Sequence, residues 1–308
     1  MSSTRIALVS DIHLSRQRPY FHFNWEILLE CLAAERPDLV LVTGDLAIDG
    51  AHRSDDLAFA RSELARLPCP WLAVPGNHDV GNNVPDLRGE AVITRERLAA
   101  YREAIGPDHW VDDRVPGWRL IGLNSLLGGS GFPEESEQAG FLSDTLDGAE
   151  GRRVALLYHV PFCDADPADP TLSGAFWHPG NRALLQRPFD EGRIALVLSG
   201  HLHESRDRTI GPVRHVWAPG VAFVTDIAGE WRIGWGGRKR VGFGLLTLGP
   251  DGAIEVAFRE PRAMMNIDIG SWLVDGIGHY AVFAGERPFL GPRVAGEPDR
   301  ALDPAEAA

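Results

Sequence analysis

Cysteine is scarce in this 308-residue sequence: only Cys31, Cys69 and Cys163 occur, and no two of them have C-x-x-C spacing. An odd and sparse set gives no disulfide framework and predicts a reducing compartment. No run approaches the roughly 18 apolar residues of a membrane-spanning helix. The N-terminus, MSSTRIALVSDIHL, also lacks the long apolar core of a secretion signal. We therefore expect a cytoplasmic protein with no membrane association.

Basic residues are also fewer than acidic ones. The sequence has 30 Lys and Arg against 43 Asp and Glu, which gives a formal net charge of −13. Binding to polymeric nucleic acid or to an anionic membrane requires a basic surface, so neither partner is expected. A small anionic substrate is still compatible with this composition, because bound cations can invert the charge locally.

Short apolar runs alternate with segments of helical periodicity in the first two thirds of the chain. The runs have the length of strands buried on both faces, and the alternation predicts a parallel sheet covered by helices. Strands are expected at Arg5–Ser10, Asp38–Thr43, Pro70–Val74, Trp118–Asn124, Arg153–Tyr158 and Arg193–Ser199. Helices are expected at Phe23–Glu35, Asp55–Leu67, Thr94–Ile105, Gln138–Asp147 and Asn181–Gln186.

The pattern changes after residue 205. Turn residues recur between short β-like runs such as Gly244–Leu248 and Ala253–Arg259, which predicts a second, more antiparallel sheet. The two halves are compatible with two sheets stacked on one core, so two independent domains are not inferred. The tail from about residue 290 is rich in Pro, Ala and charged residues, and we expect it to be flexible.

Polar clusters follow five of the predicted strands. Because the carboxyl ends of parallel strands share one edge of a sheet, these clusters are expected to meet there, where ligands bind in such folds. The clusters are Asp11-Ile12-His13, Asp45, Asn77-His78-Asp79, His159 and His201-Leu202-His203.

The residue types in these clusters are those of a metal site. Two Asp, one Asn and four His are candidate ligands, and His78 lies beside them. Imidazole and carboxylate oxygen suit Mn, Fe, Zn or Co, whereas the lack of cysteine argues against a structural zinc site. Seven ligands are too many for one such ion and suit two ions that share a carboxylate, as in two-metal hydrolases.

The complete series of motifs resembles that of the calcineurin-like metallophosphoesterase superfamily over about residues 5–220. The resemblance implies a four-layer α/β-β/α sandwich with two mixed sheets and a dinuclear centre at the carboxyl ends of the strands. It assigns one metal to Asp11, His13, Asp45 and His203, and the other to Asp45, Asn77, His159 and His201. Asp45 would bridge the two ions.

The same resemblance implies a reaction. A metal-bound hydroxide would attack phosphorus in line, while His78 stabilises the phosphate charge and protonates the leaving oxygen. Asp79 would orient His78. Substrate contacts are expected from His13, Asn77 and His78.

Two stretches favour one branch of the superfamily. Residues 44–50, GDLAIDG, lack the arginine typical of protein phosphatases, and VPGNHDV resembles bacterial cyclic-nucleotide and glycerophosphodiester phosphodiesterases. We expect residues 1–260 to form the catalytic domain and 261–308 a C-terminal extension. The expected activity is hydrolysis of a small phosphodiester, for example a 3′,5′-cyclic nucleotide. Broad phosphomonoester or organophosphate hydrolysis and a non-catalytic binding scaffold remain the alternatives.

The long loop after His159 carries the sequence GAFWHPG, in which Trp177 and His178 have two interpretations. They could contact the substrate, for instance by stacking on a base, or they could anchor the loop to the core. A homo-oligomer is compatible with the sequence.

Overall fold

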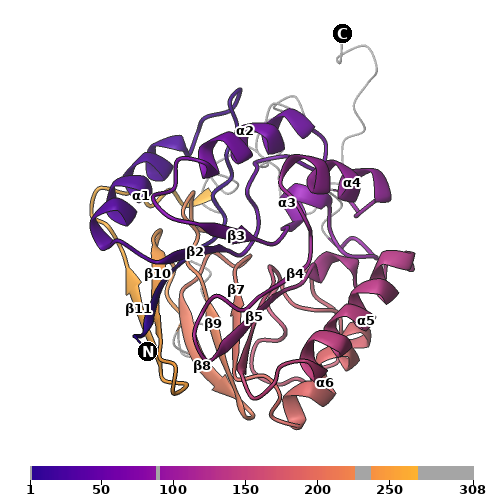
Figure 1. The fold of residues 1–308 in the computed structure, drawn as a ribbon. Helices are drawn as coiled ribbons and strands as arrows, with labels where there is room; N and C mark the ends of the chain where they lie inside the picture. The colour runs from indigo at the N-terminus through magenta and orange to yellow at the C-terminus, as the bar shows by residue number, and fades with distance from the viewer. Residues whose placement is uncertain (1, 88–90, 226–236, 270–308) are drawn as a thin grey trace, which may run out of the picture.

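Two β-sheets packed face to face, with helices outside them, form the centre of the protein (Figure 1). The structure is a computed structural model that describes residues 2–87, 91–225 and 237–269. This arrangement confirms the expected mixed α/β sandwich with two mixed sheets.

The first sheet has five strands in the order β11-β10-β1-β2-β3. Strands β1, β2 and β3 run parallel to one another. Strand β10 pairs antiparallel with β1, and β11 pairs antiparallel with β10. The bounds are β1 Thr4–Val9, β2 Leu39–Val42, β3 Trp71–Ala73, β10 Phe243–Leu248 and β11 Ile254–Arg259.

The second sheet has six strands in the order β4-β5-β6-β7-β9-β8. Strands β5, β6, β7 and β9 are parallel, and β4 and β8 are antiparallel edges. The bounds are β4 Trp110–Asp112, β5 Trp118–Gly122, β6 Arg153–Leu157, β7 Leu196–Ser199, β8 Arg206–Ile210 and β9 Val213–Trp217.

Alternate residues of each strand pack in different layers. In β1, Ile6 and Leu8 join Leu157 and Leu198 of the other sheet in a cluster between the sheets. The neighbouring Ala7 belongs to the cluster that includes helical side chains. Since side chains alternate across a strand, a continuous apolar run is what a strand covered on both faces requires.

The helices cover the outer faces of the two sheets, with α1 and α2 on the side of β1–β3 and α5 and α6 on the side of β5–β7 (Figure 1). In α1, Trp25, Leu28 and Leu32 are fully buried at helical spacing. The bounds are α1 His22–Glu35, α2 Ser54–Leu64, α3 Asn77–Val80, α4 Arg95–Ala104, η1 Ser125–Leu127, α5 Pro133–Asp147, η2 Pro179–Asn181 and α6 Ala183–Asp190.

The prediction of a separate antiparallel sheet after residue 205 is wrong. Strands β8 and β9 extend the second sheet beside β7, whereas β10 and β11 return to the first sheet beside β1. The local sequence indicates that a segment forms a strand, but it does not indicate which strand it pairs with. Pairing depends on residues far away in the chain.

The C-terminal part is described only as far as Ile269. After β11 the chain passes Met265, whose backbone is bound by Asn24 of α1, and Asp268 forms an isolated bridge with Val224. Most of the expected extension, including the tail from about 290, lies outside the described residues. Among the described helices, none has the length and apolar character needed to cross a membrane.

Candidate metal centre

The polar clusters meet where the carboxyl ends of the two sheets face each other. Strands β1, β2 and β3 of the first sheet lead to the clusters at Asp11, Asp45 and Asn77. Strands β6 and β7 of the second sheet lead to those at His159 and His201. The expectation of a single sheet edge is thus corrected: two edges supply the site, and their proximity depends on the packing of the sheets.

The backbone at this site is unusual. Within the described residues, seven non-glycine positions have positive φ, and five of these are candidate ligands: Asp11, His13, Asp45, His201 and His203. This left-handed conformation is disfavoured for residues with a Cβ and is retained where surrounding structure enforces it, often at functional sites. It reverses the chain direction just beyond a strand end, which lets side chains two positions apart converge.

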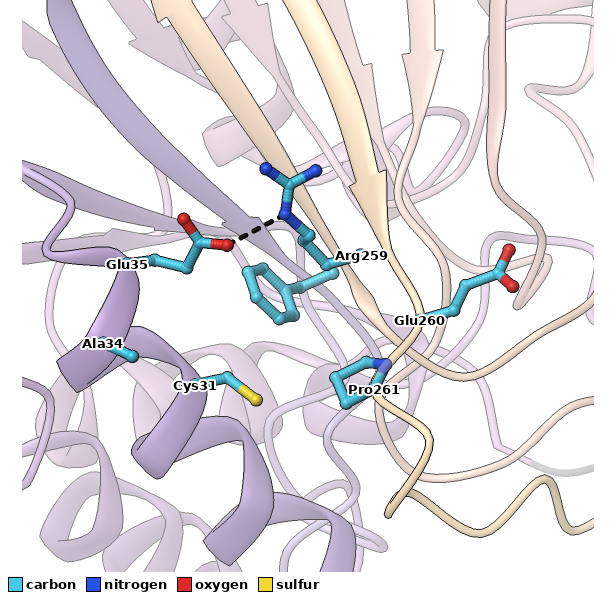
Figure 2. Close-up of a pocket in the computed structure, with 7 residues that line it drawn as sticks. Cys31, Ala34, Glu35, Arg259, Glu260 and Pro261 are labelled. Atoms are coloured by element: carbon cyan, nitrogen blue, oxygen red, sulfur yellow. Dashed lines mark hydrogen bonds and ion pairs between the residues drawn. The ribbon is translucent and has the colours of Figure 1, made fainter.

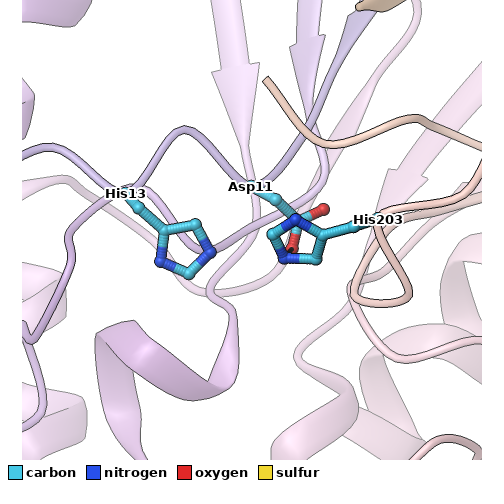
Figure 3. Close-up of side chains that lie close together, drawn as sticks. All are labelled: Asp11, His13 and His203. Carbon is cyan, nitrogen blue, oxygen red and sulfur yellow. Dashed lines mark ion pairs between the residues drawn. The ribbon is translucent and has the colours of Figure 1, made fainter. Parts of the chain in front are cut away.

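The first cluster consists of Asp11, His13 and His203, whose ligand atoms all lie within 4.8 Å of one another (Figure 3). Asp11 Oδ1 is buried, accepts no hydrogen bond from any described group and lies 3.3 Å from His203 Nε2. The opposite ring nitrogen of His203, Nδ1, lies 2.7 Å from the carbonyl oxygen of Phe223. Because a carbonyl only accepts, Nδ1 donates and Nε2 keeps its lone pair toward the cluster.

The second cluster is formed by Asp45, His159 and His201, with the amide of Asn77 beside them. His159 Nε2 lies 3.3 Å from Asp45 Oδ2, 3.1 Å from Asn77 Oδ1 and 3.1 Å from His201 Nδ1. His159 Nδ1 lies 2.7 Å from the Thr43 carbonyl, and His201 Nε2 lies 2.8 Å from that of Gly174. Carbonyl partners of this kind fix the orientation of metal-binding imidazoles.

These contacts provide a test of whether a cation fits. With both rings donating to backbone carbonyls, His159 Nε2 and His201 Nδ1 turn lone pairs toward each other and toward two oxygen acceptors. Four buried acceptors that face one point repel one another unless a positive charge lies between them. A metal ion bound by nitrogen and oxygen ligands satisfies all four, so this donor set fits a divalent cation.

Asp45 lies between the two clusters. Its Oδ2 is 3.3 Å from His159 Nε2 and 3.7 Å from His13 Nε2, and its Oδ1 accepts a hydrogen bond from the His78 backbone N–H at 2.8 Å. A carboxylate in this position can serve both clusters. This is the geometry expected of a bridging ligand.

Burial and mutual charge shift the pKa values of this centre. Burial favours the neutral carboxyl of Asp45, yet the surrounding histidines, His159 first, hold its pKa well below the usual range. Burial lowers the pKa of His159, but the Asp45 carboxylate outweighs it and raises that pKa to about 9. Burial lowers the pKa of His13 and of His203. Ligation requires neutral imidazole, so a metal cation bound beside Asp45 would take the place of a proton on His159.

Two glycines make the close approach of strand ends possible. Gly44 has φ of +101°, and a Cβ at this position would lie 2.7 Å from His159 Nδ1. A Cβ at Gly76 would overlap the Asp45 carboxylate. Any side chain at either position would displace a candidate ligand, and at Gly44 the positive φ also favours glycine.

His78 lies next to the clusters at the start of α3 and is partly exposed. Its ring is 4.7 Å from that of His13, and its Nδ1 lies 2.9 Å from the carbonyl of Ile48. The Asp79 carboxylate is fully buried and accepts backbone N–H groups of Gly76, Leu46 and Ala47 at 2.8–3.2 Å. Asp79 therefore fixes the backbone that carries Asp45 and His78.

Trp177 and His178 occupy different environments in the loop after His159. The Trp177 ring is 5 % exposed and packs against Tyr158 and Phe162 at centroid distances of 5.2 and 5.9 Å. Of the two interpretations of Trp177, the structure thus supports anchoring of the loop to the core rather than contact with the substrate. His178, in contrast, lines a small pocket together with His201. Asn82, Asn83, Asp86, Leu126 and Val160 are among the other residues that line it.

The backbone groups that orient the histidines were not foreseen from the sequence. Thr43, Gly174 and Phe223 each contribute a carbonyl oxygen, and the Phe223 ring also stacks on His203 at 4.2 Å. No residue type or spacing identifies a carbonyl partner of a histidine, because every residue has a backbone carbonyl group. Only the folded chain selects which carbonyl reaches the ring.

Comparisons with known proteins agree with this geometry. Residues 4–205 match the family described as Calcineurin-like phosphoesterase. A probable cyclic nucleotide phosphodiesterase of Synechococcus is 25 % identical over 228 residues, which cover 72 % of this chain and 76 % of that protein. The 3′,5′-cyclic adenosine monophosphate phosphodiesterase CpdA of Pseudomonas aeruginosa is 30 % identical over 63 % of this chain and 65 % of that protein.

The fold is likewise shared with solved structures. A dimetal phosphatase from Danio rerio superimposes with a TM-score of 0.54 at 15 % identity, over 84 % of this chain and 97 % of that one. The chain belongs to the calcineurin-like phosphoesterase family, whose match over residues 4–205 covers all five strand-end clusters. This confirms the expected class, a metal-dependent phosphoric ester hydrolase.

Proposed function

We propose that the protein is a dinuclear metal-dependent phosphodiesterase that hydrolyses a small diester, with a 3′,5′-cyclic nucleotide as the leading candidate. The observation that carries this proposal is the pair of ligand clusters joined by Asp45. One ion would be held by Asp11, His13, Asp45 and His203. The other would be held by Asp45, Asn77, His159 and His201.

The two ions, when bound, would supply Lewis acidity that lowers the pKa of water and neutralises charge on the attacking and leaving oxygens. The chain itself supplies preorganisation. Carbonyl groups of Thr43, Gly174 and Phe223 hold three ligand rings in position before the substrate arrives. Such fixed dipoles require little rearrangement during the reaction, which is the main source of electrostatic catalysis.

His78 is proposed as the proton donor to the leaving oxygen. Its ring stands beside His13 without belonging to the proposed ligand set, and its Nδ1 is held by the Ile48 carbonyl. With Nδ1 donating to that carbonyl, the proton for the leaving-group oxygen would be donated from Nε2. General-acid assistance of this kind typically contributes about 10²–10⁴-fold to the rate.

The small pocket beside His201 adjoins the second ligand cluster, but its volume of about 10 Å³ admits only a water-sized group, so the organic part of the substrate would lie outside it. Leu126 and Val160 give it apolar walls, and Asn83 and Asp86 give it polar groups. The names of the relatives favour a nucleotide, since both compared enzymes are described as cyclic-nucleotide phosphodiesterases. A cytoplasmic location would suit such a substrate.

The proposal is tested by hydrolysis of bis(p-nitrophenyl) phosphate and p-nitrophenyl phosphate, after chelation and after restoring Mn, Fe, Zn or Co. Cleavage of 3′,5′-cyclic AMP and cyclic GMP is then followed by chromatography of the products. We expect metal-dependent activity that favours diesters and falls about 10²–10⁴-fold in His78→Ala, while the bound metal is retained. His109→Ala, at a partly buried position away from the ligand clusters, serves as the matched control.

Other outcomes lead to the alternatives. A preference for the monoester would contradict the diester assignment and indicate a phosphatase. A protein that binds two ions but cleaves no ester with any metal would contradict the catalytic proposal and indicate a binding scaffold.

A further inference from the structure

Strand β11 is the outer strand of the first sheet, and no strand pairs with its outer edge within the described residues. Figure 1 shows it at the left margin of the molecule, away from the helices α5 and α6. An edge strand presents unpaired backbone N–H and C=O groups that can template pairing with another strand. Its side chains Glu255, Ala257 and Arg259 are exposed, whereas the alternate residues are partly buried.

The register with β10 defines which backbone groups face outward. Gly249 N–H donates to the Ala253 carbonyl at the start of the hairpin, so odd-numbered residues of β11 bond to β10. In an antiparallel pair, alternate residues of a strand bond to the neighbouring strand and the residues between them point the other way. Ile254, Val256 and Phe258 therefore turn their N–H and C=O groups outward. The outward carbonyl of Ile254 already accepts a hydrogen bond from Arg214 at 2.8 Å, which agrees with this assignment.

We propose that β11 pairs antiparallel with β11 of a second copy of this chain, about a two-fold axis through Ala257, to form one continuous ten-stranded sheet. In this register the outward groups of Val256 bond with those of Phe258 of the partner subunit. Glu255 then lies opposite Arg259 of the partner subunit, and the same pair recurs on the other side of the axis. The small Ala257 meets its own copy at the axis.

Two observations select this register over its neighbour centred on Val256. The neighbouring register would require the Ile254 carbonyl, which Arg214 already occupies. It would also place Glu255 opposite an alanine. The proposed register leaves the Arg214 contact intact and creates two opposite-charge pairs at non-hydrogen-bonded positions, where cross-strand side chains approach most closely.

The two terminal nitrogens of Arg259 can take part in this contact. Its Nε bonds to Glu35 at 2.8 Å, and Figure 2 shows its two terminal nitrogens directed away from Glu35. The groove below it, of about 480 Å³, is lined by Cys31, Phe243 and Pro261 and ends at the same strand. Nothing in this groove has to change for the two strands to pair.

The test uses the full chain in sedimentation equilibrium, with Glu255→Arg and Arg259→Glu made separately. Each variant places like charges opposite each other in its own dimer, so we expect the dimer dissociation constant to rise about tenfold or more. Mixing the two variants restores both opposite-charge pairs and should return the affinity to that of the parent chain. Thermal unfolding of each variant checks that the fold is intact.

A second variant tests the backbone contacts. Val256→Pro removes an outward N–H without touching the bonds to β10, because proline is tolerated on the free side of an edge strand. It should weaken the dimer, whereas Glu30→Gln on α1 should not. A monomer at all concentrations, a dimer unaffected by these changes, or failure of the mixed variants to associate would each overturn the proposal.

Discussion

Asn24 binds the backbone of Met265, 241 residues later in the chain, through both ends of its side-chain amide. Its Nδ2 donates to the Met265 carbonyl at 3.0 Å, and its Oδ1 accepts the Met265 N–H at 2.8 Å. The same Nδ2 lies 3.0 and 3.1 Å from the carbonyls of Val221 and Ala222. Helix α1 thereby fastens the segment that holds Phe223, the carbonyl partner of His203.

Replacement of Asn24 should therefore weaken metal binding at the cluster of Asp11, His13 and His203. Asn24→Leu keeps the size of the side chain but leaves several buried backbone groups unpaired, which costs about 1–3 kcal/mol of stability. Loss of the fixed His203 orientation should reduce metal affinity about 10–100-fold. Calorimetric titration of the chelated protein measures this affinity, with Glu30→Gln on the same helix as the control. Unchanged affinity in a destabilised variant would limit Asn24 to a role in folding.

Asp45→Asn should release most of the bound metal from both clusters. The amide matches the carboxylate in shape, but it removes the negative charge that attracts the cations and that raises the pKa of His159. Inductively coupled plasma mass spectrometry of purified protein measures the loss. The exposed residue Asp144 offers a matched control, Asp144→Asn. Selective loss of a single ion would show that Asp45 serves only one cluster.

Asp79→Asn should destabilise the protein although it preserves volume. Burial, followed by the charge of Asp45, raises the pKa of Asp79 to about 7, against the effect of the N–H groups that it accepts. An asparagine directs an NH₂ group at one set of these donors, so one or more backbone N–H groups lose their acceptor. The expected loss is about 1–3 kcal/mol in the free energy of unfolding, measured by urea denaturation. A loss of activity with unchanged stability would contradict this role.

Stability should also depend on pH through His215. This side chain is buried in β9 against Phe189, and burial lowers its pKa from the usual 6.5 to about 4. Below pH 6.5 the unfolded chain takes up a proton that the folded chain refuses, so stability falls as the pH drops from 6.5 to 4. The full effect is on the order of 3 kcal/mol.

His215→Phe removes this titration and should flatten the pH dependence of the unfolding free energy in that window. Denaturant titrations at several pH values compare the two proteins. His52→Phe, at a partly exposed position, is the control for loss of a histidine. Parallel pH profiles of the His215 variant and the parent chain would contradict the prediction.

Local sequence was sufficient for most of the elements before residue 205. Helix α1 begins one residue from its predicted start, because Trp25, Leu28 and Leu32 mark its buried face clearly. The first six predicted strands are all present, since each is an apolar run bounded by turn residues. Helix α2 begins at Ser54, one residue before its predicted start at Asp55, a difference that is common at helix ends.

The sequence by itself determined which side chains could bind metal and which strand each one follows. Asp, Asn and His residues placed directly after apolar runs specify a chemistry and a position along the chain, and both survive folding unchanged. Their order also carries the family resemblance that the match over residues 4–205 confirms.

Only the tertiary structure decided how those side chains meet. Two sheets, rather than one, bring their carboxyl ends together, because strand neighbours are chosen by pairing and packing between distant segments. The same long-range contacts place Phe223 and Gly174 against the histidine rings and enforce positive φ at five candidate ligands. Residue types do not specify which carbonyl oxygen contacts a histidine ring or which residue adopts a positive φ, so only the fold determines these features.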